Sequence, residues 1–353
     1  MKPKYEQLAD VLREQILTGV YPVETLIPSE NALQETYQMS RHTVRQAIAV
    51  LVNEGYLRKE RGSGTYVSRP DSAPKRKTIG VIMTYLSNYI FPSIIRGMEQ
   101  ELSQAGYSLL LGTTNNDHEQ EKDCLLRMME QGVDGLIVEP TKSNQYNPNL
   151  PYYVALKERG VPYLMINAFY EELGVQSICV NDTQSGYLGT KYLIDQGHEQ
   201  LLLVTKIDDL QGKYRMKGFL KAVAEAKLGL AEEDIVTYTT ETKEDLFETV
   251  LARLQERAQG VTGIVAYNDE IAYELIDRCR AVGIAVPADL SIVGNDDSQL
   301  AIGGRVGLTT TTHPKEEMGR RAARYILQAI EGGDTPSYYF EPSLIVRDSV
   351  KQA

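Results

Sequence analysis

Apolar residues recur at helical spacing in three short stretches near the N-terminus. The first stretch runs from Leu8 to Ile16, and the other two begin after Ser29 and Ser40, whose hydroxyl groups can cap a helix. Farther on, residues 55–67 alternate between apolar and polar side chains around a glycine-rich centre. The pattern predicts three short helices followed by a β-hairpin. The apolar face of the third helix is expected at Val44, Ala47, Ile48 and Leu51.

From residue 77 onward, short apolar runs alternate with helical patterns. Unbroken apolar strands separated by helices are typical of parallel sheets covered on both faces, and about nine strands favour two sheets over one. The sequence therefore predicts an α/β fold with parallel sheets for this part of the chain. The expected strands are residues 78–84, 108–114, 135–139, 163–167, 177–181, 201–205, 235–238, 263–267 and 291–294.

Residues 68–77 separate these two patterns. They include Pro70, Pro74 and the basic run Lys75-Arg76-Lys77, without apolar periodicity. Proline lacks a backbone donor and disfavours helix at the preceding residue, so this stretch is expected to be extended and solvated. We therefore divide the chain into a domain at residues 1–70, a linker at 71–77 and a larger domain at 78–353.

The charge of the chain is unevenly divided between the two domains. The net charge of all 353 residues is −11, but residues 1–70 hold 9 basic and 8 acidic side chains and carry +1, which leaves −12 for the remainder. An acidic body repels phosphate, so any contact with nucleic acid must fall on the small domain. Its basic residues cluster at Arg41 and Arg45 and again at Arg58, Lys59 and Arg61.

Several functional classes lack support in the sequence. The four histidines form no metal-ligand or catalytic-triad spacing, and no glycine-rich phosphate loop follows a strand, so we expect neither an enzyme nor a metal or cofactor site. Three widely spaced cysteines, Cys124, Cys179 and Cys279, indicate a reducing compartment. With no apolar run long enough for a membrane helix and no apolar signal core, we expect a cytoplasmic protein without membrane contact.

The third predicted helix carries basic and polar residues away from its apolar face. Arg41, His42, Arg45 and Gln46 lie near its capped N-terminus, which is the end that approaches DNA in a helix-turn-helix. The glycine tip of the hairpin, beside Arg61, can approach a DNA backbone closely. The alternative is that the arginine pair consists of solvated surface charges, which is the usual outcome for such a pair on a helix.

These 70 residues resemble the GntR family of winged-helix DNA-binding domains. The resemblance is carried by LIPSE at 26–30, MSRHTVRQA at 39–47, LVNEGYL at 51–57 and GSGTYV at 62–67. It implies that Arg41 and Arg45 contact guanine edges or phosphates, and that the hairpin tip enters the minor groove. The DNA-binding residues expected from the pattern and the resemblance are Lys4, Glu30, Ser40, Arg41, His42, Thr43, Arg45, Gln46, Arg61, Gly62, Ser63 and Gly64.

Polar residues recur at the ends of the predicted strands of the larger domain. They are Glu139, Asn167, Asn181-Asp182, Asn268-Asp269 and Asn295-Asp296-Asp297. Ligands of parallel α/β sheets bind beyond the carboxyl ends of the strands, and short planar side chains can bond adjacent hydroxyl groups. Aromatic faces for a sugar ring are available at Tyr85, Tyr89 and Phe91, and a charged donor at Arg215. The alternative is that each Asn-Asp pair merely caps the following helix.

The larger domain resembles the ligand-binding domain of the LacI/GalR family, which is similar to periplasmic sugar-binding proteins. The matching stretches include TIGVI at 78–82, FPSIIRG at 91–97, DGLIV at 134–138, RMKGF at 215–219, NDEIA at 268–272 and VPADLSIVGNDD at 286–297. The fold it implies is a two-lobed, periplasmic-binding-protein-like domain joined to an α+β winged helix-turn-helix. The implied effector-binding residues are Arg215 and Asp296, then Asn268, Tyr85, Tyr89 and Phe91, then Glu139 and Asp182. Asn295 stands where the family often has an aromatic residue, so we expect a more polar pocket floor.

The combination of the two domains is similar to the arabinose-responsive repressors of Gram-positive bacteria. This resemblance implies a repressor that binds double-stranded operator DNA and is released by L-arabinose. We expect a homodimer, because one winged helix reads one half-site and operators with two-fold symmetry match proteins with two-fold symmetry. The residues themselves indicate only a small polyhydroxylated ligand, so another sugar or a nucleoside remains an alternative effector. A transport binding protein is a further alternative, but it requires an export signal and does not require the first 70 residues.

Overall fold

A computed structural model describes residues 2–60, 62–68, 77–86, 89–256 and 260–353. The chain divides into two compact units, Met1–Arg76 and Lys77–Ala353. Of the expected linker at 71–77, only Lys77 is among the described residues. Among the described helices, none combines the length and apolar character needed to cross a membrane.

The described residues of the first unit form three helices and a two-stranded antiparallel hairpin, as predicted. The side chains of Ser29 and Ser40 accept hydrogen bonds from the backbone N–H groups of Ala32 and Thr43, so both serines cap their helices. The apolar stripe of the third helix is buried in a core shared with the first helix and the hairpin. The elements are α1 (Lys4–Leu17), α2 (Glu30–Tyr37), α3 (Arg41–Asn53), β1 (Leu57–Glu60) and β2 (Gly64–Val67).

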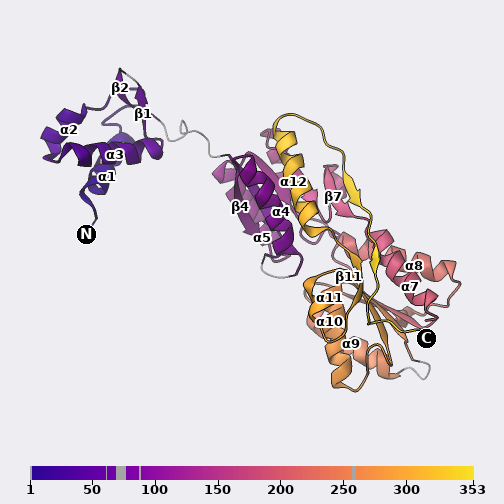
Figure 1. Cartoon of the computed structure of the whole chain (residues 1–353). Coiled ribbons are helices and arrows are strands. Elements are labelled where there is room, and N and C mark those ends of the chain that lie inside the picture. The colour runs from indigo at the N-terminus through magenta and orange to yellow at the C-terminus, as the bar shows by residue number, and fades with distance from the viewer. Residues whose placement is uncertain (1, 61, 69–76, 87–88, 257–259) are drawn as a thin grey trace. The chain divides into compact units, whose positions relative to one another are not determined.

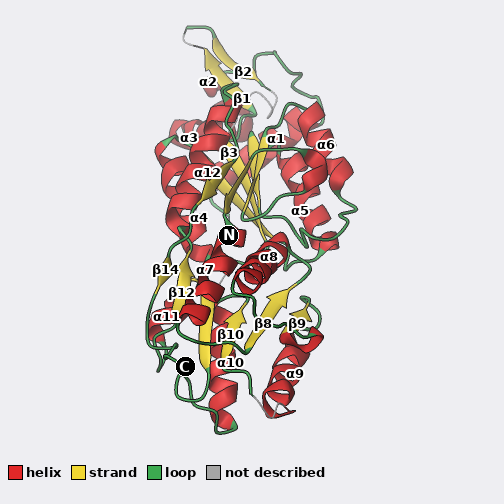
Figure 2. Ribbon diagram, turned by 90° about the vertical axis from the view of Figure 1, so that its right-hand side faces the viewer, coloured by secondary structure: helices red, strands yellow, loops and turns green. Residues whose placement is uncertain are grey.

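The first lobe of the second unit is built on a six-stranded parallel sheet in the order β13-β7-β6-β5-β3-β4. Its strands are β3 (Thr78–Met83), β4 (Ser108–Thr113), β5 (Gly135–Val138), β6 (Tyr163–Ile166), β7 (Ser177–Val180) and β13 (Tyr338–Phe340). Side chains alternate across the sheet, so Val81 packs toward one pair of helices and Ile82 toward the other. Figure 2 shows these pairs on opposite sides of β3. They are α4 (Phe91–Gln104) with α12 (Lys315–Ile330), and α5 (His118–Gln131) with α6 (Leu150–Glu158).

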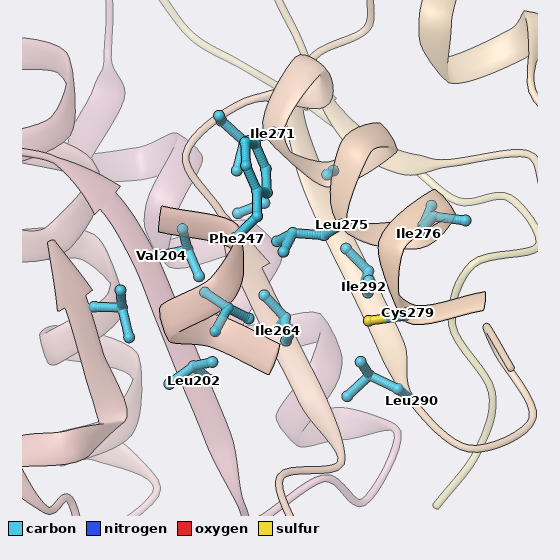
Figure 3. Packing of buried hydrophobic residues seen from close by; sticks show 14 of the residues in the cluster. Leu202, Val204, Phe247, Ile264, Ile271, Leu275, Ile276, Cys279, Leu290 and Ile292 are labelled. Carbon is cyan, nitrogen blue, oxygen red and sulfur yellow. The ribbon is translucent and has the colours of Figure 1, made fainter. Parts of the chain in front are cut away.

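The second lobe repeats this plan with the order β14-β12-β11-β10-β8-β9, in which only the β12–β14 pair is antiparallel. Its strands are β8 (Leu201–Lys206), β9 (Ile235–Tyr238), β10 (Gly263–Ala266), β11 (Ser291–Asp296), β12 (Thr309–Thr312) and β14 (Leu344–Ile345). One face of the sheet packs on α9 and α10, where Val204, Ile264 and Ile292 meet Phe247 and Leu275 (Figure 3). The other face packs on α7 and α8, which lie side by side (Figure 1). The helices are α7 (Asp182–Asp195), α8 (Leu210–Glu225), α9 (Lys243–Glu256), α10 (Asp269–Ala281) and α11 (Gln299–Gly303).

The two parallel sheets confirm the predicted architecture, but three strands were not predicted. The strand β12 consists of four threonines, so it lacks the apolar run that marked the other strands. The strands β13 and β14 are three and two residues long and lie at sheet edges, where short half-buried segments carry little periodic signal. These strands matter because the chain crosses between the lobes three times, at residue 181, at 313–314 and at 341–343.

Candidate functional site

A cavity of about 280 Å³ lies between the two lobes of the second unit. Its wall contains side chains from the carboxyl ends of strands in both sheets, which is where the topology places a ligand site. The eight residues predicted to bind the effector all line this cavity: Tyr85, Tyr89, Phe91, Glu139, Asp182, Arg215, Asn268 and Asp296. The rings of Tyr85 and Phe91 lie 5.7 Å apart, so they form one aromatic surface within the wall.

Arg215 is held between two acidic residues of the cavity wall. Its Nε donates a 2.8 Å hydrogen bond to Oδ1 of Asp182, and its Nη2 donates a 3.0 Å bond to Oδ1 of Asp296. Both carboxylates are buried. Burial raises the pKa of Asp182 to about 7, although Arg215 acts in the opposite direction. Burial also acts to raise the pKa of Asp296, but the positive charge of Arg215 and other contacts outweigh it and the net shift is downward.

Tyr89 connects the first lobe to the carboxyl end of β11. Its hydroxyl group donates a 2.6 Å hydrogen bond to Oδ2 of Asp296 and accepts one of 3.1 Å from the backbone N–H of Asp269. The backbone of Tyr89 adopts a φ of +67°, which is uncommon for a residue with a side chain. Burial and the neighbouring carboxylates raise the pKa of Tyr89 well above its usual value, so the hydroxyl group stays protonated and can donate.

A second chain of hydrogen bonds runs from Glu139 to His313. The carboxylate of Glu139 accepts a bond from the Thr84 backbone N–H at 2.9 Å and from Nδ2 of Asn167 at 2.6 Å. Oδ1 of Asn167 then lies 3.0 Å from Nε2 of His313. Because Asn167 donates through Nδ2, its Oδ1 is an acceptor, which assigns the proton of a neutral His313 to Nε2. Burial lowers the pKa of His313 to about 4, so the neutral ring prevails at neutral pH.

Several cavity residues were missed by the sequence analysis. Lys206 lies 3.2 Å from Asp208 and 3.3 Å from Asp209, with 13% of its side chain exposed. The rule that pointed to Asn268, a polar residue just past a strand, applies equally to the two aspartates after β8. His313 follows the unpredicted strand β12, so no such rule was available for it. The missed polar and aromatic residues are Thr84, Asn116, Lys206, Asp209, Gln211, Tyr238, Thr240, Lys243, Tyr267, Glu270 and His313.

Some of the polar residues at strand ends have structural partners instead. Asn181 caps α7, and Asp297 pairs with Arg347. Asp269 accepts hydrogen bonds from Thr310 and from the backbone of Ser298. The capping alternative is therefore right for part of this set. Asn268 does both, because it caps α10 and lines the cavity.

The expectation that Asn295 forms the floor of the pocket is wrong. Asn295 is buried, accepts a hydrogen bond from the hydroxyl group of Thr311 and is absent from the described cavity wall. Successive side chains of a strand point to opposite faces of the sheet, so when the side chain of Asp296 points into the cavity, that of Asn295 points to the other face.

The N-terminal half of α3 presents the predicted DNA-binding residues to solvent. Arg41, His42, Arg45 and Gln46 are exposed, whereas Thr43 is half-buried and bonded to Ser40. The Arg41 and Arg45 side chains are 67% and 61% exposed. Their Nε atoms lie 3.6 Å and 3.5 Å from the carboxylate of Glu30, so one acidic residue holds both guanidinium groups near the start of the helix.

The hairpin tip is exposed at Gly62, Ser63 and Gly64. The two glycines have φ values of +83° and +131°, which glycine adopts without strain. Arg61 lies outside the described residues. Of the other basic residues predicted to cluster there, Lys59 is exposed, but Arg58 is neutralised by Glu24 and Glu60.

The remaining candidate, Lys4, lies exposed at the start of α1. It is set apart in sequence from both α3 and the hairpin, so its assignment rests on the resemblance alone.

Two family models match the chain. Residues 4–67 match the gntR family of bacterial regulatory proteins, and residues 190–350 match the periplasmic binding protein-like domain. These matches confirm the two resemblances inferred from the sequence.

Two relatives are similar to the chain from end to end. The arabinose metabolism transcriptional repressor of Halalkalibacterium halodurans is 46% identical over 367 residues, covering 100% of this chain and 98% of that protein. The protein of the same name from Geobacillus stearothermophilus is 44% identical over 99% of this chain and 98% of its own.

A crystal structure of a LacI family transcriptional regulator from Enterococcus faecium with bound ribose has a similar fold. It covers 78% of this chain and 100% of that one, with a TM-score of 0.68 and 23% identity. At this identity the likeness shows the fold alone. The full-length identity to the two relatives shows more: the chain belongs to their family of bacterial transcriptional repressors, in which a gntR-family DNA-binding domain precedes a periplasmic-binding-protein-like domain.

Proposed function

We propose that this repressor binds operator DNA through α3 and the hairpin tip, and that L-arabinose bound in the interlobe cavity releases it. The observation that carries the proposal is the chemistry of the cavity wall. Carboxylates, amides and a guanidinium group converge there from both lobes, beside the aromatic pair of Tyr85 and Phe91. Such groups bond hydroxyls in fixed directions, while an aromatic face packs against the apolar side of a sugar ring.

The size of the cavity supports a small ligand. Sites for drug-sized molecules span roughly 300–1,000 Å³, and this cavity holds about 280 Å³. A monosaccharide suits that volume better than a disaccharide does. L-Arabinose is the specific choice because both full-length relatives are named arabinose metabolism repressors. A different pentose, a hexose or a nucleoside is the alternative, and the ligand screen described below separates these cases.

The DNA-binding role is supported by the exposed polar face of α3. Arg41 and Arg45 project from the capped end of that helix, where the positive end of the helix dipole also attracts phosphate. We expect the base and phosphate contacts to come from Arg41, His42, Thr43, Arg45 and Gln46, with the tip at Gly62–Gly64 in the minor groove. Glu30, Ser40, Lys4 and Arg61 complete the proposed interface.

The proposal includes a homodimer that acts in the cytoplasm as a regulator without catalytic activity. A single winged helix reads one half-site, and operators with two-fold symmetry match proteins with two-fold symmetry. Sugar binding would favour one arrangement of the two lobes and so change the spacing of the two DNA-binding units.

A thermal-shift screen of pentoses, hexoses and nucleosides on the purified protein tests the effector. A ligand that binds only the folded state raises the melting temperature by mass action, so L-arabinose should do so at concentrations where the other compounds do not. If a nucleoside stabilises the protein, or another sugar does so at a lower concentration than L-arabinose, that compound and not L-arabinose is the effector.

A further inference from the structure

The wall of the interlobe cavity includes Val180, Asp182 and His313, which lie at or beside two of the three crossings of the chain. These crossings follow β7, β12 and β13, and with β14 these strands occupy one end of each sheet order. The loops after β4 and β5 in the first lobe, and after β8 and β9 in the second, lie toward the opposite ends. Any bond between these loops therefore joins the lobes on the side of the cavity away from the crossings.

Four hydrogen bonds of this kind lie close together. Nδ2 of Asn116 donates a 2.6 Å bond to Oγ1 of Thr240, whose hydroxyl group donates at 2.7 Å to Asp208. Nδ2 of Asn144 donates a 3.0 Å bond to the backbone carbonyl of Ile207. The backbone N–H groups add two more bonds, from Asn144 to the Asp208 carbonyl at 3.2 Å and from Leu210 to Oγ of Ser143 at 2.9 Å.

An ion pair completes the set. Nζ of Lys142 contacts Oε1 of Glu241, and this contact lowers the pKa of Glu241 to about 2. We call the whole set the distal junction. Its first-lobe members are Asn116, Lys142, Ser143 and Asn144, and its second-lobe members are Ile207, Asp208, Leu210, Thr240 and Glu241.

We propose that the distal junction holds the two lobes together over the cavity, so that its residues position the lobes for effector binding. The identity of the effector rests on the function proposed above, but the claim that the distal junction holds the lobes together does not depend on it. If the lobes open by rotating about the crossings, contacts far from the crossings oppose this rotation with the longest lever arm. These contacts must therefore break before a ligand bound between the lobes can leave on that side.

The first-lobe side of the junction is built as a clamped loop. The hydroxyl group of Tyr170 accepts a 2.7 Å bond from the backbone N–H of Thr141, which fixes the start of the loop. At the other end, Asn147 and Asn149 donate bonds of 2.7 Å and 2.8 Å to Oε2 of Glu121. Glu121 is fully buried, so its carboxylate must be satisfied by such donors. Residues 142–144 are thus presented in a fixed conformation.

This clamp has an energetic consequence for closure. A loop that is already ordered loses little conformational entropy when the junction forms, so more of the hydrogen-bond free energy remains to hold the lobes. Tyr153 and Tyr170 reinforce the clamp, because their hydroxyl groups donate to Oε1 of Glu121 at 2.8 Å and 2.7 Å.

Three members of the junction can be changed without touching the cavity wall. Lys142, Asn144 and Glu241 are absent from the described residues that line the cavity. A change in ligand affinity on replacing them must therefore act through the arrangement of the lobes. Asn116 and Thr240 line the cavity and are left intact for this reason.

The first experiment measures the lobes without any ligand, in the full-length protein. Spin labels are placed at the exposed Glu158 in the first lobe and the exposed Glu248 in the second, in samples diluted with unlabelled chain. The double variant Asn144→Ala/Glu241→Gln should give a longer and broader distance distribution than the parent. The matched control is Glu119→Gln, which removes an exposed ion pair with Lys122 inside α5 and should match the parent. Identical distributions for the parent and the double variant would overturn the proposal.

The second experiment measures L-arabinose affinity by calorimetry for the same proteins. Loss of one hydrogen bond and one partly exposed ion pair should weaken binding by about 3- to 30-fold, mainly through faster dissociation. Equal affinity in the parent and the double variant would contradict the proposal. If the parent itself does not bind L-arabinose, the proposed effector is wrong, and the distance measurement alone still decides the role of the distal junction.

Discussion

The hydroxyl group of Tyr89 lies 2.6 Å from Oδ2 of Asp296 and so links the first lobe to the end of a second-lobe strand. This contact sits inside the cavity wall, and Asp296 is the same residue that holds Arg215. A ligand that engages Asp296 or Tyr89 therefore acts on groups that already connect the lobes. This is the structural reason to expect that ligand binding and lobe arrangement are coupled.

Replacing Tyr89 by phenylalanine should weaken that coupling. The change leaves a buried carboxylate without one of its donors, which typically costs about 1–3 kcal/mol of folding free energy. We expect a lower melting temperature and weaker sugar binding by calorimetry. Tyr85→Phe is the matched control, because Tyr85 also lines the cavity but is 39% exposed and carries no comparable bond between the lobes among those described. Equal effects of the two changes would argue against a special role for Tyr89.

Close packing of α7 against α8 positions Arg215. A Cβ atom at Gly218 would lie 2.1 Å from the backbone carbonyl oxygen of Thr183, so Gly218→Ala must push the helices apart. Overpacking of this kind costs about 1–3 kcal/mol, and it should also move Arg215 away from Asp182 and reduce sugar affinity. Thermal unfolding and calorimetry measure both effects. Gly229→Ala is the control, since nothing lies within 4 Å of the position that a Cβ atom would take there and its stability should hardly change.

The stability of the fold should depend on the protonation of Asp182. Its pKa is raised from 3.8 to about 7 in the folded protein, so between these values the folded state holds a proton that the unfolded state has lost. The contribution of Asp182 is therefore fully present below about pH 4 and is lost as the pH rises toward 7. Compared with Asp182→Asn, the parent should lose unfolding free energy over this range by at most about 1.4 kcal/mol per pH unit. Chemical denaturation at several pH values measures the difference, and a difference that stays constant or rises with pH would refute this assignment.

Arg41→Ala should weaken operator binding and spare the cavity. Loss of an arginine that contacts a base or a phosphate costs about 1–3 kcal/mol, or roughly 5- to 150-fold in affinity. Fluorescence anisotropy with operator DNA measures this loss, and calorimetry should find sugar affinity unchanged. Arg159→Ala, which removes an exposed arginine from the second unit, controls for the change in net charge. A loss of sugar affinity in Arg41→Ala would contradict the division of functions between the two units.

Much of the fold could be predicted because its signals are local. Capping serines, apolar stripes and unbroken apolar strands are properties of neighbouring residues, so the helices of the first unit and nine strands of the second were found from the sequence. The strand β12 was missed because its burial is achieved by threonine hydroxyl groups that find partners across the chain, such as Thr310 with Asp269. That pairing is a tertiary property with no local signature.

The candidate site also combines residues that local sequence signals predict with residues that only tertiary contacts bring in. The motifs predicted Asp296 and Arg215 correctly as cavity residues. His313 follows the unpredicted strand β12, and Lys206 ends β8, at whose carboxyl end no site residue was predicted. The distal junction could not be predicted from the sequence. Its partners bonded between the lobes lie 63 residues or more apart in the sequence, and most are loop residues without a recognisable motif. Asn295 and Asp296 are adjacent polar residues, and the alternation of side chains along the strand decides which of the two faces the cavity.

The central claim is that occupation of the cavity controls DNA binding, and titration of L-arabinose into a preformed protein–operator complex tests it most directly. Couplings between sites typically change affinity by about 5- to 150-fold, so saturating L-arabinose should raise the Kd for operator DNA of the parent protein within that range. Asp296→Ala should bind the operator as the parent does but show no response to the sugar. An operator Kd that L-arabinose leaves unchanged in the parent, or shifts equally in parent and Asp296→Ala, would contradict the account.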